Sequence, residues 1–327
     1  MRRRDFITFL GGAAVARSRG ARAQQSKMPV TGFLHSASPD SYAPQANAFR
    51  QSLKETGYVE GQNVAVEYRW AEDQIDRLPT MAAELAHRQV TVIVAGGSPV
   101  SALAAKSATT IIPIVFMNVA DPVGIGLVAS FNRPGGNITG ATLLSAELVA
   151  KRLGILRDLL PSVKRIAVLV NPTRPGVDSQ REQVQEAAQA LGLALQILEA
   201  SSEPDFEAVF RTVVSQQHSA LIVAPDALFV AHRAQIADLA TRYRIATMYE
   251  FRNFVEAGGL ISYGASPEEL YRQGGTLTGQ ILAGKKPADL PVLQPTKFEL
   301  VINMKTAGAL GLTISSDLLS IADELIE

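Results

Sequence analysis

Residues 90–99 of the chain read Val-Thr-Val-Ile-Val-Ala-Gly-Gly-Ser-Pro. The apolar run over 90–95 lacks a regular polar alternation, which is typical of a parallel strand that is buried on both faces of its sheet. Gly96 and Gly97 allow a tight turn, and Ser98 followed by Pro99 is a strong helix start. The stretch therefore predicts a buried strand, a polar tip and a helix in direct succession.

The same strand–helix succession continues along the chain in both directions. We predict strands at 30–34, 64–68, 90–95 and 114–117 in the first half, and at 165–170, 194–198, 220–224 and 247–249 in the second. Amphipathic helical stretches separate these strands. The alternation predicts an α/β fold, and its occurrence twice predicts two doubly wound parallel-sheet lobes joined by a hinge. One wide doubly wound sheet is the alternative.

The composition excludes several classes of function. The chain has 327 residues, 47% of them hydrophobic, which is enough for two lobes that each bury a core. Lys plus Arg equals Asp plus Glu, at 31 each, so no basic surplus favours binding to nucleic acid. The absence of Cys excludes disulfides, Cys-based zinc sites, thiol catalysis and a lipidated Cys anchor.

The N-terminus has the order of an export signal. Arg2, Arg3 and Arg4 precede a short apolar run, and an Ala-Arg-Ala cleavage site follows at 21–23. We therefore predict a signal peptide over residues 1–23, Tat-like because of the paired arginines, with Sec as the other route. No later segment is long and apolar enough to span a bilayer, so we expect a mature protein in the periplasm.

Polar residues follow the predicted strands at the points where a ligand would sit. In open parallel sheets, ligands bind beyond the carboxyl ends of the strands, beside helix N-termini. We expect the ligand to lie between the lobes and to contact these tips. The candidate ligand-binding residues are Ser36, Ser38, Ser98 and Asp121 in the first half, and Asn171, Thr173, Asp226, Tyr249 and Tyr263 in the second.

No catalytic constellation is present in the sequence. The four His residues have no metal-ligand spacing, and the sequence has neither a P-loop nor a G-x-S-x-G motif, so we predict no metal, no cofactor and no enzymatic activity. An enzyme that uses Asp121 and Asp226 as a carboxylate pair is one alternative. An extracellular ligand-sensing partner of a membrane receptor is another.

Six stretches carry a resemblance to a known family. They are the Arg2–Ile7 signal with Ala23–Gln25, and the stretches at 57–63, 120–123, 133–140, 258–264 and 295–303. With these motifs the chain resembles the ABC transporter substrate-binding proteins of the family that includes the tryptophan-binding TrpX-type proteins. The matching stretches run in order along essentially the whole chain.

The resemblance implies a type I periplasmic-binding-protein fold with three crossovers between lobes. It implies a first lobe of 28–143 plus 264–290 and a second of 144–263 plus 291–327. The lobes are expected to close on a small organic ligand, an amino acid or an aromatic compound, by hinge motion. The expected partner is an ABC permease in the inner membrane, and the expected state is a monomer.

Overall fold

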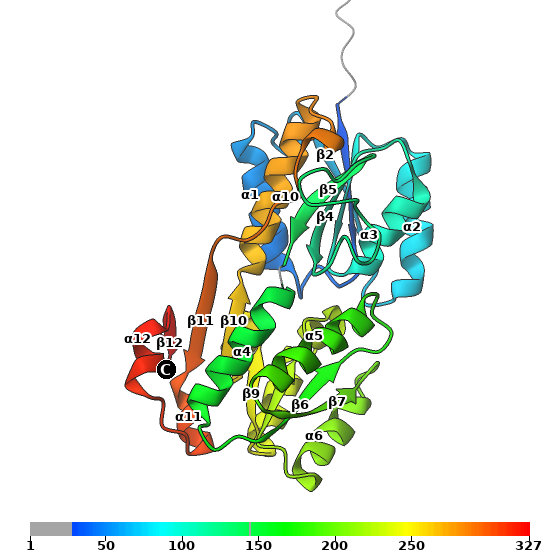
Figure 1. The fold of residues 1–327 in the computed structure, drawn as a ribbon. Coiled ribbons are helices and arrows are strands. Elements are labelled where there is room, and N and C mark those ends of the chain that lie inside the picture. Colours follow the sequence, from blue (N-terminus) through cyan, green and yellow to red (C-terminus); the bar gives the residue numbers. More distant parts are fainter. Residues whose placement is uncertain (1–27, 144) are drawn as a thin grey trace, which may run out of the picture.

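The computed structural model describes residues 28–143 and 145–327, which form two α/β lobes. Figure 1 shows the lobes one above the other, with the blue and cyan elements in the upper lobe and the red C-terminal elements in the lower. The predicted signal peptide over 1–23 lies outside the described residues. No helix in the described part of the chain is long and apolar enough to cross a membrane.

The first lobe is built on a five-stranded sheet with the order β2-β1-β3-β4-β5, and all of its pairings are parallel. Its strands are β1 (Val30–His35), β2 (Ala65–Trp70), β3 (Val92–Gly96), β4 (Ile114–Val119) and β5 (Ile138–Thr142). Its helical elements are α1 (Ala43–Glu55), η1 (Ile75–Arg77), α2 (Leu78–His87), α3 (Pro99–Ala108), α10 (Pro267–Leu282) and η2 (Pro287–Asp289). Helices α1 and α10 pack together, as do α2 and α3.

The second lobe is built on a seven-stranded sheet with the order β12-β11-β10-β9-β8-β6-β7, in which only the β10–β11 pairing is antiparallel. Its strands are β6 (Arg165–Val170), β7 (Ala194–Glu199), β8 (Ala220–Val223), β9 (Ala246–Tyr249), β10 (Ile261–Ala265), β11 (Phe298–Asn303) and β12 (Glu324–Ile326). Its helices are α4 (Ser145–Leu159), α5 (Val177–Ala190), α6 (Asp205–Ser215), α7 (Ala227–Ala231), α8 (Arg233–Arg242), α9 (Arg252–Glu256), α11 (Met304–Leu310) and α12 (Ser316–Ile321).

Two separate sheets confirm the predicted two-lobed α/β fold and exclude one wide sheet. The physical reason is visible in β3 and β6. Every residue of β3 is buried, and so is every residue of β6 after Arg165. Strands of this kind need helices on both faces, and the first sheet receives one of its helices, α10, from the second half of the chain.

The chain passes between the lobes after β5, after β10 and before β11. Ala265 still pairs with Phe298 inside the second sheet, whereas Leu293 pairs with Ala141 beside the first. We therefore propose lobe boundaries of 28–143 with 266–293, and 145–265 with 298–327. These differ by a few residues from the boundaries expected from the sequence.

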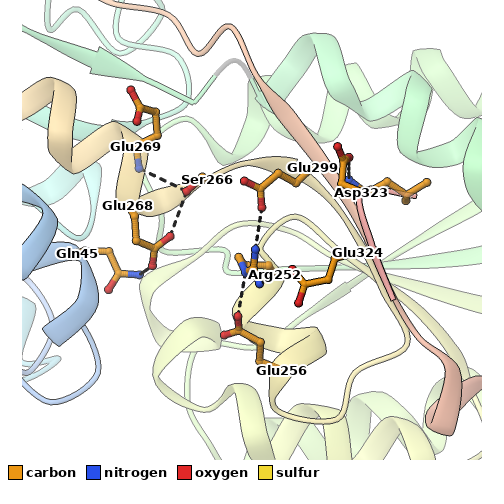
Figure 2. A network of polar contacts seen from close by, with 10 residues as sticks. Gln45, Arg252, Glu256, Ser266, Glu268, Glu269, Glu299, Asp323 and Glu324 are labelled. Atoms are coloured by element: carbon orange, nitrogen blue, oxygen red, sulfur yellow. Dashed lines mark hydrogen bonds and ion pairs between the residues drawn. The ribbon is translucent and has the colours of Figure 1, made fainter. Parts of the chain in front are cut away.

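Close helix packing holds the returning helix α10 against the first lobe. A Cβ atom at Gly275 would lie 2.5 Å from the carbonyl oxygen of Phe49, so glycine is needed where α10 crosses α1. At the start of α10, Ser266 Oγ accepts the Glu269 N–H and donates to Glu268, and Gln45 of α1 donates to Glu268 at 2.9 Å (Figure 2). This cap fixes the point where the chain re-enters the first lobe.

Arg252 joins three elements at the outer edge of the second lobe. Its guanidinium contacts Glu256 at 2.8 Å, Glu299 of β11 at 3.1 Å and Glu324 of β12 at 2.8 Å. Figure 2 shows the Arg252 side chain among these carboxylates. Because β12 has only three residues, the Arg252–Glu324 ion pair adds to the pairing with β11 that holds the C-terminal strand.

We expect Arg252→Met to lower the free energy of unfolding by about 1 kcal/mol, because it leaves three neighbouring carboxylates without their shared cation. Urea denaturation at low and high salt measures the change, which high salt should reduce. Arg242→Met, which breaks exposed ion pairs with Asp238 of α8 and Glu207 of α6, is the control and should have a smaller effect. Equal losses in the two variants would contradict the structural role of Arg252.

Candidate functional site

A cavity of about 190 Å³ lies between the two lobes, and both lobes line it. It sits where strand order reverses in each sheet, between β1 and β3 in the first and between β6 and β8 in the second. Loops diverge at such switch points and leave room for a ligand. The lining residues are Ser36, Asp73, Ile75, Ser98 and Val100 of the first lobe, and Asn171, Thr173, Arg174, Pro175, Ser201, Asp226, Ala227 and Leu228 of the second.

Two buried hydroxyl groups face this cavity without a protein partner. Ser36 and Ser98 are 1% and 8% exposed, and neither Oγ atom has a hydrogen-bond partner among the described residues. Ser98 occupies the N-cap position of α3, yet its side chain makes no cap bond. A buried hydroxyl without a partner is costly, so these groups are suited to bind something that enters the cavity.

The loop that carries Ser98 is held rigidly from both sides. Gly97, at a φ of +85°, donates its N–H to the Tyr271 hydroxyl at 3.0 Å and accepts from Asn118 Nδ2 at 3.0 Å. His35 Nδ1 accepts the Ala37 N–H, so the neutral ring carries its proton on Nε2 and donates to Tyr271 at 2.7 Å. These buried bonds aim the N-terminus of α3 at the cleft, where the positive end of the helix dipole favours an anion.

Arg174 is the cation of the cleft. It lies in the loop after β6 and lines the main cavity and two smaller voids of about 30 and 10 Å³. Its guanidinium makes no ion pair or side-chain hydrogen bond with any described residue. Burial lowers the pKa of Arg174, and the nearby carboxylates of Asp226 and Glu250 oppose that shift. The group still remains protonated, because arginine has a very high ordinary pKa.

Asp226 is the second-lobe anion that faces Arg174. Its Oδ1 accepts the N–H of Leu228 at 2.9 Å and the Asn171 amide at 3.1 Å, and Asn171 Oδ1 accepts from the Thr173 hydroxyl at 2.8 Å. Burial raises the pKa of Asp226, whereas Arg174 and these hydrogen bonds lower it. The carboxylate is therefore fixed in place and oriented beside a cation.

A separate buried ion pair lies in the second lobe, near the point where the chain leaves for the first. Arg152 of α4 contacts Glu250 at 3.0 Å and donates to the Tyr263 carbonyl at 2.7 Å, and both charged side chains are at most 4% exposed. Burial lowers the pKa of Arg152, and Glu250 opposes that shift. The ion pair neutralises Glu250, which leaves Arg174 and Asp226 as the second lobe's charges in the main cavity.

Comparison with known proteins agrees with this geometry. The profile of the family described as ABC transporter substrate binding protein matches residues 30–326. The chain belongs to this family. It is therefore a solute-binding protein for a small organic ligand, and ABC substrate-binding proteins act outside the cytoplasm with an ABC permease as partner.

Individual relatives cover most of the chain. A tyrosine-binding protein of Clostridioides difficile (strain R20291) is 28% identical over 265 residues, which is 81% of this chain and 75% of the relative. A Streptococcus pneumonia ABC domain in complex with L-Trp is 25% identical, has a TM-score of 0.84 and covers 92% of this chain and 100% of its own. A conserved domain protein from Vibrio cholerae has 25% identity and a TM-score of 0.85, over 91% of this chain and 100% of its own.

In this family member, five of the sequence-predicted residues line the main cavity: Ser36, Ser98, Asn171, Thr173 and Asp226. The other four lie elsewhere. Ser38 bonds to Ser41, and Asp121 accepts the Gly124 N–H beside the 30 Å³ void. Tyr249 is fully buried and stacks on Phe254, and Tyr263 packs against Phe298, so neither ring lines the main cavity.

Two charged residues of the cavity are missing from the sequence-based set. Arg174 lies four residues beyond β6 and Asp73 three beyond β2, and their positions depend on loop paths, at Asp73 one with positive φ. The sequence does show that each of these charged residues lies in a loop after a parallel strand, which could have marked it as a candidate. It does not show whether the loop turns toward the cavity. Because Asp121 and Asp226 line different cavities, the geometry does not favour the two as a catalytic pair.

The buried His35 predicts a pH dependence of stability. Burial lowers the pKa of His35 to about 3, whereas the unfolded chain has the ordinary value of 6.5. As pH falls below 6.5, His35 becomes protonated in the unfolded state but stays neutral in the folded state. The free energy of unfolding therefore decreases, by about 2 kcal/mol at pH 5. Urea denaturation at pH 7 and 5 measures this. His35→Gln should flatten the decrease, and His87→Gln, at an exposed position, should not. An unchanged slope in His35→Gln would contradict the assignment.

Proposed function

We propose that this protein binds an amino acid in the cleft and delivers it to an ABC importer. The observation that carries the proposal is the pairing of one cation and one anion, Arg174 and Asp226, on the wall of a single cavity beside two buried hydroxyls without partners. A zwitterion carries the complementary charges. No uncharged or singly charged ligand would satisfy both groups at once.

Each end of the ligand has a suitable partner. The carboxylate would bind Arg174 and Ser98 Oγ at the positive end of the α3 dipole. The ammonium group would bind Asp226, which Asn171 holds in place. The anion and cation sites are thus on adjoining walls, and they would orient the α-carbon between the lobes.

The remaining walls of the cavity would contact the ligand side chain. Ile75 and Val100 from the first lobe and Pro175 and Leu228 from the second are apolar. They suit an apolar or aromatic group, which agrees with the tyrosine and tryptophan that relatives bind. We infer an amino acid with such a side chain as the ligand.

The location and assembly of the protein complete the proposal. We propose that residues 1–23 are removed on export, by a Tat-like route, and that the mature protein acts in the periplasm as a monomer without enzymatic activity. A role as a sensor partner would use the same cleft. Copurification with a permease rather than with a receptor separates the two roles.

A thermal-shift screen of amino acids and aromatic acids tests the ligand class. A ligand at 100 times its dissociation constant stabilises the folded state by about 2.7 kcal/mol, which is a clear shift in Tm. We expect amino acids with apolar or aromatic side chains to raise Tm. Stabilisation by none of the amino acids would contradict the proposal.

Titration of cleft variants tests the site. We expect Ser98→Ala to weaken binding about five- to tenfold, and Arg174→Met about 10- to 100-fold, from the loss of a neutral and a charge-assisted hydrogen bond respectively. Ser38→Ala is the matched control, because Ser38 lies outside the cavity and should retain wild-type affinity. Wild-type affinity in both Ser98→Ala and Arg174→Met would remove these residues from the site.

A further inference from the structure

Asp73 is a first-lobe carboxylate at the rim of the main cavity, and it is held there at a conformational cost. Glu72 and Asp73 have φ values of +54° and +62°, a region that non-glycine residues seldom adopt. Backbone hydrogen bonds to the end of β1 compensate for this cost. The N–H of Asp73 donates to the carbonyl oxygen of Ser36 at 2.8 Å, and the N–H of Ala71 donates to the carbonyl oxygen of His35 at 2.8 Å. The loop thus presents Asp73 beside Ser36 in the cleft.

Asp226 lines the same cavity from the second lobe, so the two lobes bring carboxylates to one space. The Asp73 carboxylate has no hydrogen bond or ion pair with the described residues. The titratable groups near it are Asp226 and His232 of the second lobe and the Tyr42 hydroxyl. Partial burial raises the pKa of Asp73, His232 lowers it, and Asp226 raises it by a smaller amount. Because Asp73 and Asp226 line one cavity of about 190 Å³ from opposite lobes, their like charges repel one another across the cleft.

We propose that Asp73 and Asp226 form a carboxylate pair, one from each lobe, which the ammonium group of the ligand bridges when the lobes close. The inference rests on the proposed amino-acid function and adds a role for charge in closure. Without a ligand, the repulsion opposes closure. With a bound ammonium group, each carboxylate gains a cation partner, and the lobes are drawn together.

This pair also makes the cleft selective. A carboxylic acid of the same shape that lacks the ammonium group would still reach Arg174 and Ser98, yet it would close two facing carboxylates without a cation between them. The remaining repulsion between the two carboxylates lowers the affinity for such a ligand. Asp73 thus acts as a specificity-determining residue for amino acids over the corresponding deaminated acids.

Asp73→Asn tests the proposal with little risk to the fold, because asparagine tolerates positive φ as aspartate does. The probes are L-tyrosine and 3-(4-hydroxyphenyl)propanoate, which differ by the ammonium group. We expect Asp73→Asn to weaken L-tyrosine binding about fivefold, as for an exposed ion pair, and to leave binding of the propanoate unchanged or tighter. Asp76→Asn, at an exposed position on η1, is the control and should alter neither. An equal loss for both probes would overturn the proposal.

A ligand-free measurement separates this inference from the proposed function. The chain has no native Cys, so spin labels can be placed on cysteines introduced at the exposed positions Lys54 and Glu203, one in each lobe. We expect Asp73→Asn to increase the closed population without ligand, and Asp76→Asn to leave it unchanged. If L-tyrosine does not bind the wild-type protein, the proposed amino-acid function is wrong. The ligand-free distance comparison then still tests whether Asp73 and Asp226 repel one another. Identical distance distributions in Asp73→Asn and wild type would overturn it.

Discussion

Polar groups that are removed from water need hydrogen-bond partners, and the space between the lobes does not supply them all. Ser36 and Ser98 are buried with unbonded hydroxyls, and the Arg174 guanidinium has no ion pair among the described residues. Elsewhere the same chain pairs its buried charges, as Arg152 and Glu250 show. In the cleft, the hydroxyls of Ser36 and Ser98 and the Arg174 guanidinium are therefore available to a ligand.

The rest of the fold keeps those groups in position. Tyr271, from the helix that returns to the first lobe, fixes Gly97 and His35, so the α3 N-terminus is held before any ligand arrives. In the second lobe, Asn171 and the start of α7 hold Asp226. Each lobe is thus preorganised separately, and the remaining freedom lies in the three connections between them. Binding energy is then available for closure rather than for ordering loops.

The sequence predicts the two sheets well because their central strands are continuous apolar runs, as at Val92–Ala95. It does not predict β5, whose short run contains Thr139, Gly140 and Thr142, nor the three-residue β12, which depends on Arg252 and on pairing with β11.

The site follows the same division. Ser36, Ser98 and Asp226 are predictable because parallel strands deliver their carboxyl ends to one edge. The positions of Arg174 and Asp73 in the cavity depend on the paths of their loops. At Asp73 the path includes a positive φ, which the residue type does not predict. Tyr249 ends a strand as expected, but the direction of its ring is set by packing on Phe254.

The most direct measurement of the central claim is a crystal structure of the protein with L-tyrosine. We expect electron density between the lobes, with the ligand carboxylate within hydrogen-bonding distance of Ser98 Oγ and Arg174 and its ammonium group at Asp226. Density at another surface, or a cleft in which Arg174 turns inward to bind Asp226 and leaves no room for a ligand, would contradict it.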